Sequence, residues 1–220
     1  MGGEATSQTF VFADLAGFTA LTEAHGDEQA ADVVADFVEC TRRHIDGSEV
    51  EEVKSIGDAL MLRAPDAAEA VRIAVDLSEE IGGRAGFLGL RIGMHTGAAV
   101  ERQGDWFGSA VNIAARIAAL ASSGEVLLSE ATAESAGSNE QIELTSAGRQ
   151  QLRNVSEPVR LFKASLAGER SNEGWPIDPV CRMSVEPRLA AGSLTHAGQV
   201  FHFCSLQCAA SFAAAPESYG

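Results

Sequence analysis

The sequence predicts an α+β protein, in which helices pack on a sheet and a small second unit follows. Three observations predict this class. Short β-branched or aromatic runs are interspersed with longer stretches in which apolar residues recur at helical spacing. The resulting order, β-α-α-β-β-α-β-α-β, differs from a simple βαβ repeat. The small and polar stretch 167–175 then precedes about 45 residues that hold three of the four cysteines.

The chain is predicted to begin with a strand and a long helix. TFVFADL, residues 9–15, is rich in β-branched and aromatic residues, which predicts a buried strand with Asp14 at its end. DEQAADVVADFVECTRRHI, residues 27–45, carries apolar residues at helical spacing and predicts an amphipathic helix. Asp27 is suited to cap the start of this helix.

A hairpin is predicted next. Residues 48–54 and 58–64 are two strand-like runs joined at 55–57, so Lys54 and Asp58 flank one turn. Lys54 is one of only two lysines in a chain that otherwise uses arginine as its cation. A surface lysine on a hairpin is the ordinary interpretation, but its rarity here favours a functional one.

The rest of the first unit is predicted to alternate helices with strands. Helical spacing predicts helices at 66–81 and 110–121, and apolar or β-branched runs predict strands at 89–100, 124–129 and 159–165.

Composition divides the chain into two domains. We expect a tail at 1–8, a first domain at 9–166, a linker at 167–175 and a second domain at 176–220. A unit as short as the second seldom holds together on its apolar core alone, so its three cysteines are expected to staple it.

The charge of the chain excludes some classes of partner. A net charge of −15, from 31 acidic and 16 basic residues, argues against the basic surface of a nucleic-acid-binding protein. No apolar run approaches the roughly 18 residues of a membrane span, and residues 1–8 lack the regions of a secretion signal. We therefore expect a cytoplasmic protein with neither nucleic acid nor membrane as partner.

Asp14 and Asp58 are the first candidate site residues. If their two strands are neighbours, the carboxylates converge on one point, which is how proteins hold hard divalent cations beside a polyphosphate. Single aspartates at strand ends are also common as caps and turn residues. The two residues alone leave both interpretations open.

Four further motifs make the first domain recognisable. FADLAGFTALTE, EEVKSIGDALML, RIGMHTGAAV and GDWFGSAVNIAAR, in this order, resemble the catalytic domain of class III nucleotidyl cyclases. RNVSEPVRLFKA is similar to the closing strand of that family, so the resemblance covers about three quarters of the chain. It implies a class III cyclase-type (ferredoxin-like) sheet with helices packed on it.

The resemblance also implies roles for individual residues in an adenylate cyclase that forms cyclic AMP from ATP. It implies three sets of residues. The first binds two Mg²⁺ or Mn²⁺ ions per site, the second binds the purine, and the third holds the ribose and stabilises the transition state. These are Asp14 and Asp58 with the carbonyl of Leu15 for the metals, Lys54 and Asp105 for the purine, and Asn112 and Arg116 for the ribose and transition state.

In the family such sites lie at a head-to-tail homodimer interface, so the resemblance implies a homodimer as well. One chain gives the metal aspartates and the other the remaining polar residues. Lys54 and Asp58 are close in sequence across one turn, which makes two sites fed by two chains plausible.

The purine assignment has an independent chemical basis. Adenine presents an acceptor at N1 and donors at N6, so an ammonium opposite N1 and a carboxylate opposite N6 complement it. Guanine presents the reverse pattern, and Lys54 with Asp105 therefore favours ATP over GTP.

One segment departs from the family pattern. The family often carries a lysine near the closing strand that touches the triphosphate, where this chain reads LRNVSEPV. Arg153 is a candidate substitute, and Asn154 stands where a glycine is common.

The second domain carries a cysteine pattern of its own. Cys181, Cys204 and Cys208, with DPVCRM and FHFCSLQC around them, resemble YHS domains and related TRASH-like metal-binding modules. Thiolates select soft or borderline ions such as Cu⁺ or Zn²⁺. A fourth ligand could be His202, His196 or a residue from outside the domain, and the cysteines could instead be small buried hydrophobes.

Three functions remain open at the level of sequence. The complete set of six polar residues favours an adenylate cyclase whose output is linked to a metal-responsive YHS domain. The first alternative is a catalytically weak or silent nucleotide-binding module that transmits a metal signal. The second is a metal carrier in which the cyclase domain is a passenger.

Overall fold

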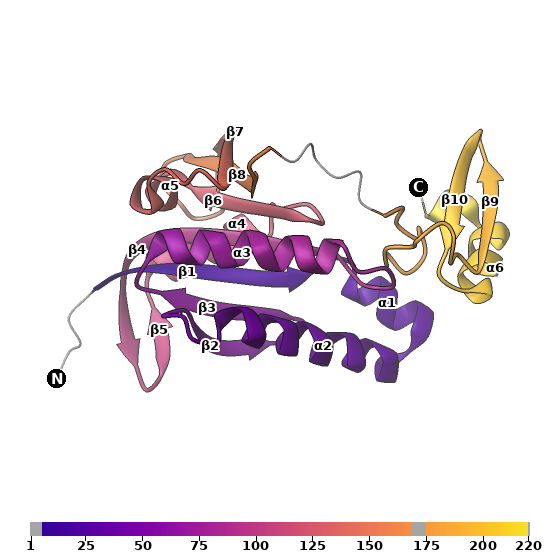
Figure 1. Ribbon diagram of the computed structural model, residues 1–220, viewed down its shortest axis with the longest axis horizontal. Coiled ribbons are helices and arrows are strands. Elements are labelled where there is room, and N and C mark those ends of the chain that lie inside the picture. Colours follow the sequence, from indigo (N-terminus) through magenta and orange to yellow (C-terminus); the bar gives the residue numbers. More distant parts are fainter. Residues whose placement is uncertain (1–5, 169–174, 220) are drawn as a thin grey trace.

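The computed structural model describes residues 6–168 and 175–219 (Figure 1). The strands are β1 (Thr6–Leu15), β2 (Glu51–Ile56), β3 (Ala59–Ala64), β4 (Leu90–Arg102), β5 (Asp105–Phe107), β6 (Glu125–Ser129), β7 (Ile142–Gln150), β8 (Val159–Leu166), β9 (Gly192–His196) and β10 (Gln199–Phe203). The helices are α1 (Phe18–His25), α2 (Asp27–Ile45), α3 (Ala67–Gly82), α4 (Ser109–Ala118), α5 (Glu130–Ala136), α6 (Leu206–Ala214) and the short 3₁₀ helix η1 (Pro216–Ser218).

The first domain is built on one sheet with strand order β2-β3-β1-β4-β6-β8-β7, and β5 pairs with the far end of β4. All neighbours are antiparallel except β4 and β6. The aromatic and β-branched run of β1 lies inside this sheet, between β3 and β4. Asp14, near the end of β1, pairs with Ala59 on one side and Arg91 on the other.

The two faces of the sheet are covered differently. Val11, Ala13 and Leu15 of β1 belong to the larger core cluster, which includes the apolar sides of α2 and α3. Phe10 and Met61 face the other way and pack in a smaller cluster with residues of α4. Since side chains alternate along a strand, Phe12 and Asp14 share the α4 face with Phe10. That face carries the smaller of the two core clusters.

The α+β class predicted from the sequence is confirmed, with differences at element ends. β1 begins at Thr6, so residues 6–8, assigned to a tail, belong to the sheet. Gly26, not Asp27, is the N-cap of α2, and no side chain caps it; Asp27 instead lies in the first turn, where its charge favours the helix dipole. The helices α5, α6 and η1 and the strands β5, β7, β9 and β10 were not predicted as elements, and α1 was expected only from the order of elements, without bounds. Most of the predicted linker, 169–174, lies outside the described residues.

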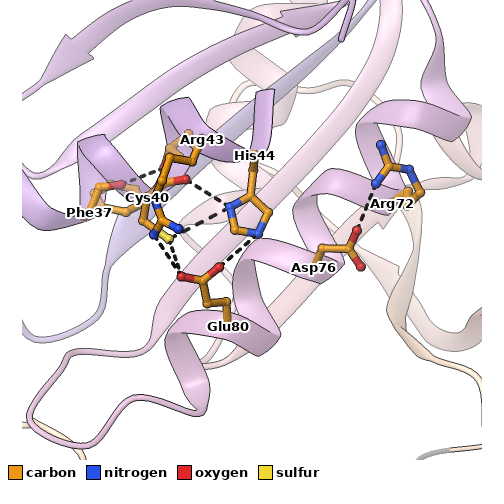
Figure 2. A network of polar contacts seen from close by, with 8 residues as sticks. Phe37, Cys40, Arg43, His44, Arg72, Asp76 and Glu80 are labelled. Carbon is orange, nitrogen blue, oxygen red and sulfur yellow. Dashed lines mark hydrogen bonds and ion pairs between the residues drawn. The ribbon is translucent and has the colours of Figure 1, made fainter. Parts of the chain in front are cut away.

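A polar network fastens α2 to α3 (Figure 2). The buried Cys40 thiol donates to Glu80 Oε1 at 3.3 Å, and Arg43 donates to the same oxygen at 3.0 Å. His44 Nε2 lies 3.5 Å from Glu80 Oε2. Burial, and then the Glu80 carboxylate, raises the pKa of Cys40 to about 11, so the thiol stays protonated and can donate. Because Arg43 already balances the Glu80 charge, we interpret this cluster as structural.

Gly93 sets how closely α4 approaches the sheet. A Cβ at this position would lie 1.9 Å from the backbone nitrogen of Ala118 and 2.4 Å from its Cα, so the helix would have to move. We expect Gly93→Ala to lower the free energy of unfolding by about 3 kcal/mol, the upper end of ordinary overpacking, measured by urea or thermal denaturation. Gly82→Ala is the matched control, because nothing lies within 4 Å of its added Cβ. Equal midpoints for the two variants would contradict this packing argument.

The second domain is a hairpin of β9 and β10 followed by α6, and it lies beside α1 (Figure 1). Its apolar centre is Phe212, whose ring packs 4.8 Å from Phe201 and 5.4 Å from Phe203 between centroids. The domain docks on the loop before β4: Gly86 N donates to Ser184 O, and Ser184 N donates to Phe87 O, both at 2.8 Å.

Among the described residues no helix has the length and apolar character of a membrane span.

Candidate active site

Asp14 and Asp58 come together at one end of the sheet. Asp14 is next to last in β1, and its pairing partner on β3 is Ala59. Asp58 directly precedes Ala59 in the chain. Arg91, the partner of Asp14 on β4, makes an ion pair with its carboxylate. The expected convergence of the two aspartates is therefore present, with an arginine beside them.

The electrostatics of Asp14 reflect this crowding. Burial raises its pKa, and the neighbouring Asp58 carboxylate adds to the rise, whereas Arg91 opposes it. Two carboxylates side by side are unfavourable unless a cation lies close to both. A bound cation would therefore stabilise the ionised forms of the two carboxylates.

These residues fit divalent cations. Carboxylate oxygens are the ligands that Mg²⁺ and Mn²⁺ prefer, and Asp14 retains 24% of its side-chain exposure, which leaves the carboxylate accessible. The Leu15 side chain is fully buried in the core, so Leu15 can contribute only its backbone carbonyl.

Lys54 and Asp105 also meet, from strands far apart in the sequence. Lys54 Nζ donates to Asp105 Oδ2 at 2.6 Å, and the two side chains are 39% and 31% exposed. The hydrogen bond from Lys54, and one from the Trp106 backbone, hold the pKa of Asp105 below its usual range. The Asp105 carboxylate is therefore ionised at neutral pH, and both side chains are accessible.

Lys54 lies on the same sheet face as Asp14. It pairs with Met61, which packs under α4, and Met61 pairs with Phe12 of β1. Two strand spacings across and two residues along put the Cα atoms of Lys54 and Asp14 about 12 Å apart. The Lys54–Asp105 pair and the two carboxylates thus lie on one face of the sheet, apart from each other.

Asn112 and Arg116 lie on the outer side of α4. The helix buries Ala110, Ala114 and Ile117 against the sheet. At 100° per residue, Asn112 and Arg116 point roughly opposite to that buried side. Asn112 is exposed and Arg116 half-buried, and no hydrogen bond or ion pair of Arg116 is found within 6–168 and 175–219. They face away from the carboxylates of their own chain.

Apolar side chains remain exposed beside the Lys54–Asp105 pair. Ile56, on the strand and face of Lys54, is 49% exposed, and Phe107, two residues after Asp105, is 54% exposed. Large exposed apolar residues that cluster near a site are typical of a surface covered by a partner.

The departure near the closing strand is compatible with the family backbone. Asn154 has φ of 57°, in the left-handed region that favours glycine, which accounts for glycine being common there. Arg153 is exposed, so its guanidinium is free to extend from the loop.

The three cysteines of the second domain form a cluster. Cys181 Sγ lies 3.4 Å from Cys204 Sγ, and Cys204 Sγ lies 3.7 Å from Cys208 Sγ, so the thiols are adjacent but not bonded as disulfides. His25 of α1 joins them, and the four ligand atoms lie within 4.8 Å of one another. Three soft thiolates and an imidazole are a donor set that fits Zn²⁺ or Cu⁺.

Asp178 organises this cluster from behind. Its side chain is fully buried, Oδ2 accepts from Cys204 N at 2.8 Å, and Oδ1 accepts from Val180 N at 2.9 Å. Hydrogen bonding from Cys181 lowers the pKa of Cys204 to about 7, whereas burial raises the pKa of Cys208 to about 12. Cys204 is the thiol that ionises first.

Three residues of these sites were not predicted: Arg91, Asp178 and His25. Arg91 is an ordinary arginine within a strand, and only the β1–β4 register pairs it with Asp14. Asp178, in DPVC, could have been found from its position three residues before Cys181. His25 is 179 residues from Cys204, so no local pattern connects them.

Comparison with known proteins identifies both domains. The family described as the adenylate and guanylate cyclase catalytic domain matches residues 4–162, and the YHS domain matches residues 177–220. A nucleotidyl cyclase fold with converging aspartates is thus followed by a cysteine-rich module. The chain belongs to the class III adenylate and guanylate cyclase family and carries a C-terminal YHS domain.

Individual relatives point the same way. A "pH-sensitive adenylate cyclase" of Mycobacterium tuberculosis is 35% identical over 169 residues, which cover 76% of this chain and 42% of the relative. A structure of adenylate cyclases from Trypanosoma brucei superposes with a TM-score of 0.68 at 25% identity, over 76% of this chain and 92% of that one. A "Copper-transporting P-type ATPase" of Rhizobium leguminosarum is 52% identical over 51 residues, 23% of this chain and 6% of the relative. The chain spans less than half the length of these curated relatives.

Proposed function

We propose that the protein is an adenylate cyclase that converts ATP to 3′,5′-cyclic AMP and pyrophosphate at sites shared by two copies of the chain. The single observation that carries the choice of ATP is the Lys54–Asp105 pair at 2.6 Å. N1 and N6 of adenine lie next to each other on one edge, so a lysine and an aspartate in contact match that edge in spacing as well as in polarity. Guanine would set donor against donor and acceptor against acceptor.

The reaction requires positioning and charge stabilisation more than covalent catalysis. The ribose 3′-oxygen forms a bond to the α-phosphorus while the bond to the bridging oxygen of the leaving pyrophosphate breaks, and the hydroxyl proton is released. Two divalent ions held by Asp14, Asp58 and the Leu15 carbonyl would ease ionisation of the hydroxyl and neutralise the pyrophosphate.

The remaining residues act on the nucleotide directly. Arg116 donates to oxygens that gain charge in the transition state, where a fixed donor contributes about 3 kcal/mol. Asn112, one helical turn before it, orients the ribose. Arg153 is the candidate contact for the triphosphate.

The proposal needs two chains because of the direction of α4. Asn112 and Arg116 point away from their own sheet, so a nucleotide that they contact must lie against the outer side of α4. A second copy of the chain, arranged head to tail, brings its own Asp14 and Asp58 to that surface. A two-fold dimer then contains two equivalent sites.

The direct test is to incubate the purified protein with ATP or GTP and Mn²⁺ or Mg²⁺ and to measure both cyclic nucleotides. We expect cyclic AMP with either metal and little cyclic GMP. Nucleotide binding without cyclisation would instead support the silent nucleotide-binding module.

The base-reading pair yields a prediction about specificity. We expect Lys54→Glu with Asp105→Cys to lower kcat/KM for ATP at least about 100-fold, because a donor and an acceptor then face the wrong adenine atoms. The ratio of cyclic GMP to cyclic AMP should rise. The measurement is kcat/KM for both nucleotides in one preparation.

The chain supplies a matched control for this variant. Lys163, the other lysine, is 51% exposed and pairs with Glu125 at 3.5 Å, away from the candidate site. Lys163→Glu makes the same lysine-to-glutamate change at an exposed pair away from the site and should leave the nucleotide preference unchanged, since an exposed pair contributes little. If both variants keep the ATP preference of the unmodified chain, Lys54 and Asp105 do not read the base.

The YHS domain is proposed to bind Zn²⁺ or Cu⁺ through Cys181, Cys204 and Cys208, and cyclase output is proposed to follow its metal state. The clustered free thiols support this, and they suit a reducing, cytoplasmic location. Metal titration of the full chain beside a Cys204→Ser/Cys208→Ser variant tests it. Absence of stoichiometric binding would make the cysteines structural.

A further inference from the structure

His25 brings the first domain to the cysteine cluster of the second. It is the last residue of α1, and its half-buried ring points its Nε2 atom at the thiols. His25 Nε2 lies 3.4 Å from Cys204 Sγ and 3.6 Å from Cys208 Sγ. The four ligand atoms therefore come from both domains. His25 lies on α1 of the first domain, whereas Cys181, Cys204 and Cys208, the last on α6, belong to the second.

The spacing of these atoms matches the edges of a tetrahedral site. Bonds of about 2.3 Å to sulfur and about 2.0 Å to nitrogen, at tetrahedral angles, separate two sulfurs by about 3.8 Å and a sulfur from a nitrogen by about 3.5 Å. Four of the six edges are known individually: the S–S distances are 3.4 and 3.7 Å, and the S–N distances are 3.4 and 3.6 Å. The other two, from Cys181 to Cys208 and to His25, are within 4.8 Å. One ion could contact all four atoms with little movement.

The two histidines of the YHS domain itself do not take this place. His196 Nε2 lies 3.4 Å from Glu217, and its ring meets the edge of Phe212. His202 is absent from the group of ligand atoms, and its Nδ1 is buried without a hydrogen-bond partner among the described residues. Of the three possibilities left open by the sequence, the geometry favours a ligand from outside the domain.

We propose that His25 is the fourth ligand of a Cys₃His site for a thiophilic cation, shared between the cyclase and YHS domains, so that metal binding fastens the two domains together. This extends the proposed metal binding of the YHS domain but is independent of cyclisation. The chemistry is that of Zn²⁺ or Cu⁺, and the two ions are separate arms of the test.

The second domain contacts the segments next to Asp14 and Arg91 in the chain. Gly17, three residues after Asp14, has φ of 88°, and a Cβ there would lie 2.6 Å from Cβ of Arg182, the neighbour of Cys181. On the other side, Ser184 bonds to Gly86 and Phe87, in the loop that leads into Arg91. The docked domain therefore touches both segments that continue into the Asp14–Arg91 pair.

The experiment titrates Zn²⁺, Cu⁺ and the spectroscopic probe Co²⁺ into the full-length protein under reducing conditions. We expect His25→Ala to weaken binding of Zn²⁺ or Cu⁺ at least about 100-fold, while Cys204→Ser and Cys208→Ser weaken it further. X-ray absorption of the loaded protein should show one imidazole and three sulfur ligands, and the imidazole signal should vanish in His25→Ala. His25→Gln serves if the alanine variant fails to fold.

His196→Ala is the matched control, since it removes a histidine of the YHS domain and should change neither affinity nor spectrum. Hydrogen exchange provides the second readout: the amides of Gly86 and Ser184 should exchange more slowly with metal in the unmodified chain, but not in His25→Ala. Equal affinity and an unchanged imidazole signal in His25→Ala overturn the shared site. Absence of metal binding in the unmodified chain refutes metal binding by the YHS domain altogether, whatever the cyclase assay shows.

Discussion

Replacing Asp14 or Asp58 by alanine is expected to abolish cyclisation, with kcat reduced at least about 1000-fold while the fold survives. Each substitution removes one of two carboxylates that converge beside Arg91. The cation that would activate the 3′-hydroxyl and neutralise pyrophosphate is then no longer held. The measurement is cyclic AMP formation at saturating ATP and Mn²⁺.

The fold should tolerate both changes. Burial and Asp58 raise the pKa of Asp14, which means that the folded state disfavours its charged form at neutral pH, so removing the carboxylate should not lower stability. Arg91 is 35% exposed and can be solvated when its partner is lost. Asp32→Ala, on the exposed side of α2, is the control and should retain full activity. Retained turnover in a folded Asp14→Ala protein would refute the metal role of Asp14.

The parts of the fold that could be predicted are those where apolar spacing is strong. The β1 run, and the helices α2 and α3, bury one side and expose the other, so their periodicity is visible in the sequence. β7 was missed because nearly all of its residues are exposed, which leaves no alternation to detect. The short helix α5 has small residues and depends on the Ser129 cap, whose side chain accepts from Thr132 N.

The candidate site divides in the same way. Asp14, Lys54 and their motif partners could be found because each sits in a distinctive local stretch. Arg91 and His25 could not, because what matters is the register of β1 on β4 and the docking of the second domain on α1. Contacts between residues 77 or 179 positions apart are decided by packing, which local sequence does not encode.

Mixing two inactive chains is expected to restore activity if the site is shared. Asp14→Ala damages the carboxylate half-site, and Arg116→Ala damages the outer side of α4. In a heterodimer of the two, one site carries both lesions and the other carries none. Random pairing of equal amounts makes half of the dimers mixed, each with one intact site of two, so about a quarter of the unmodified activity should return.

The choice of partner lesion makes this test specific. Mixing Asp14→Ala with Asp58→Ala should restore nothing, because both residues belong to the same half-site and every site then lacks one carboxylate. The restored signal in the first mixture should also follow the fraction of heterodimers, measured with two distinguishable affinity tags. If both mixtures stay inactive although heterodimers form, each site is complete within one chain, and the outward direction of Asn112 and Arg116 must have another cause. If both mixtures recover equally, the exchange reflects refolding rather than a shared site.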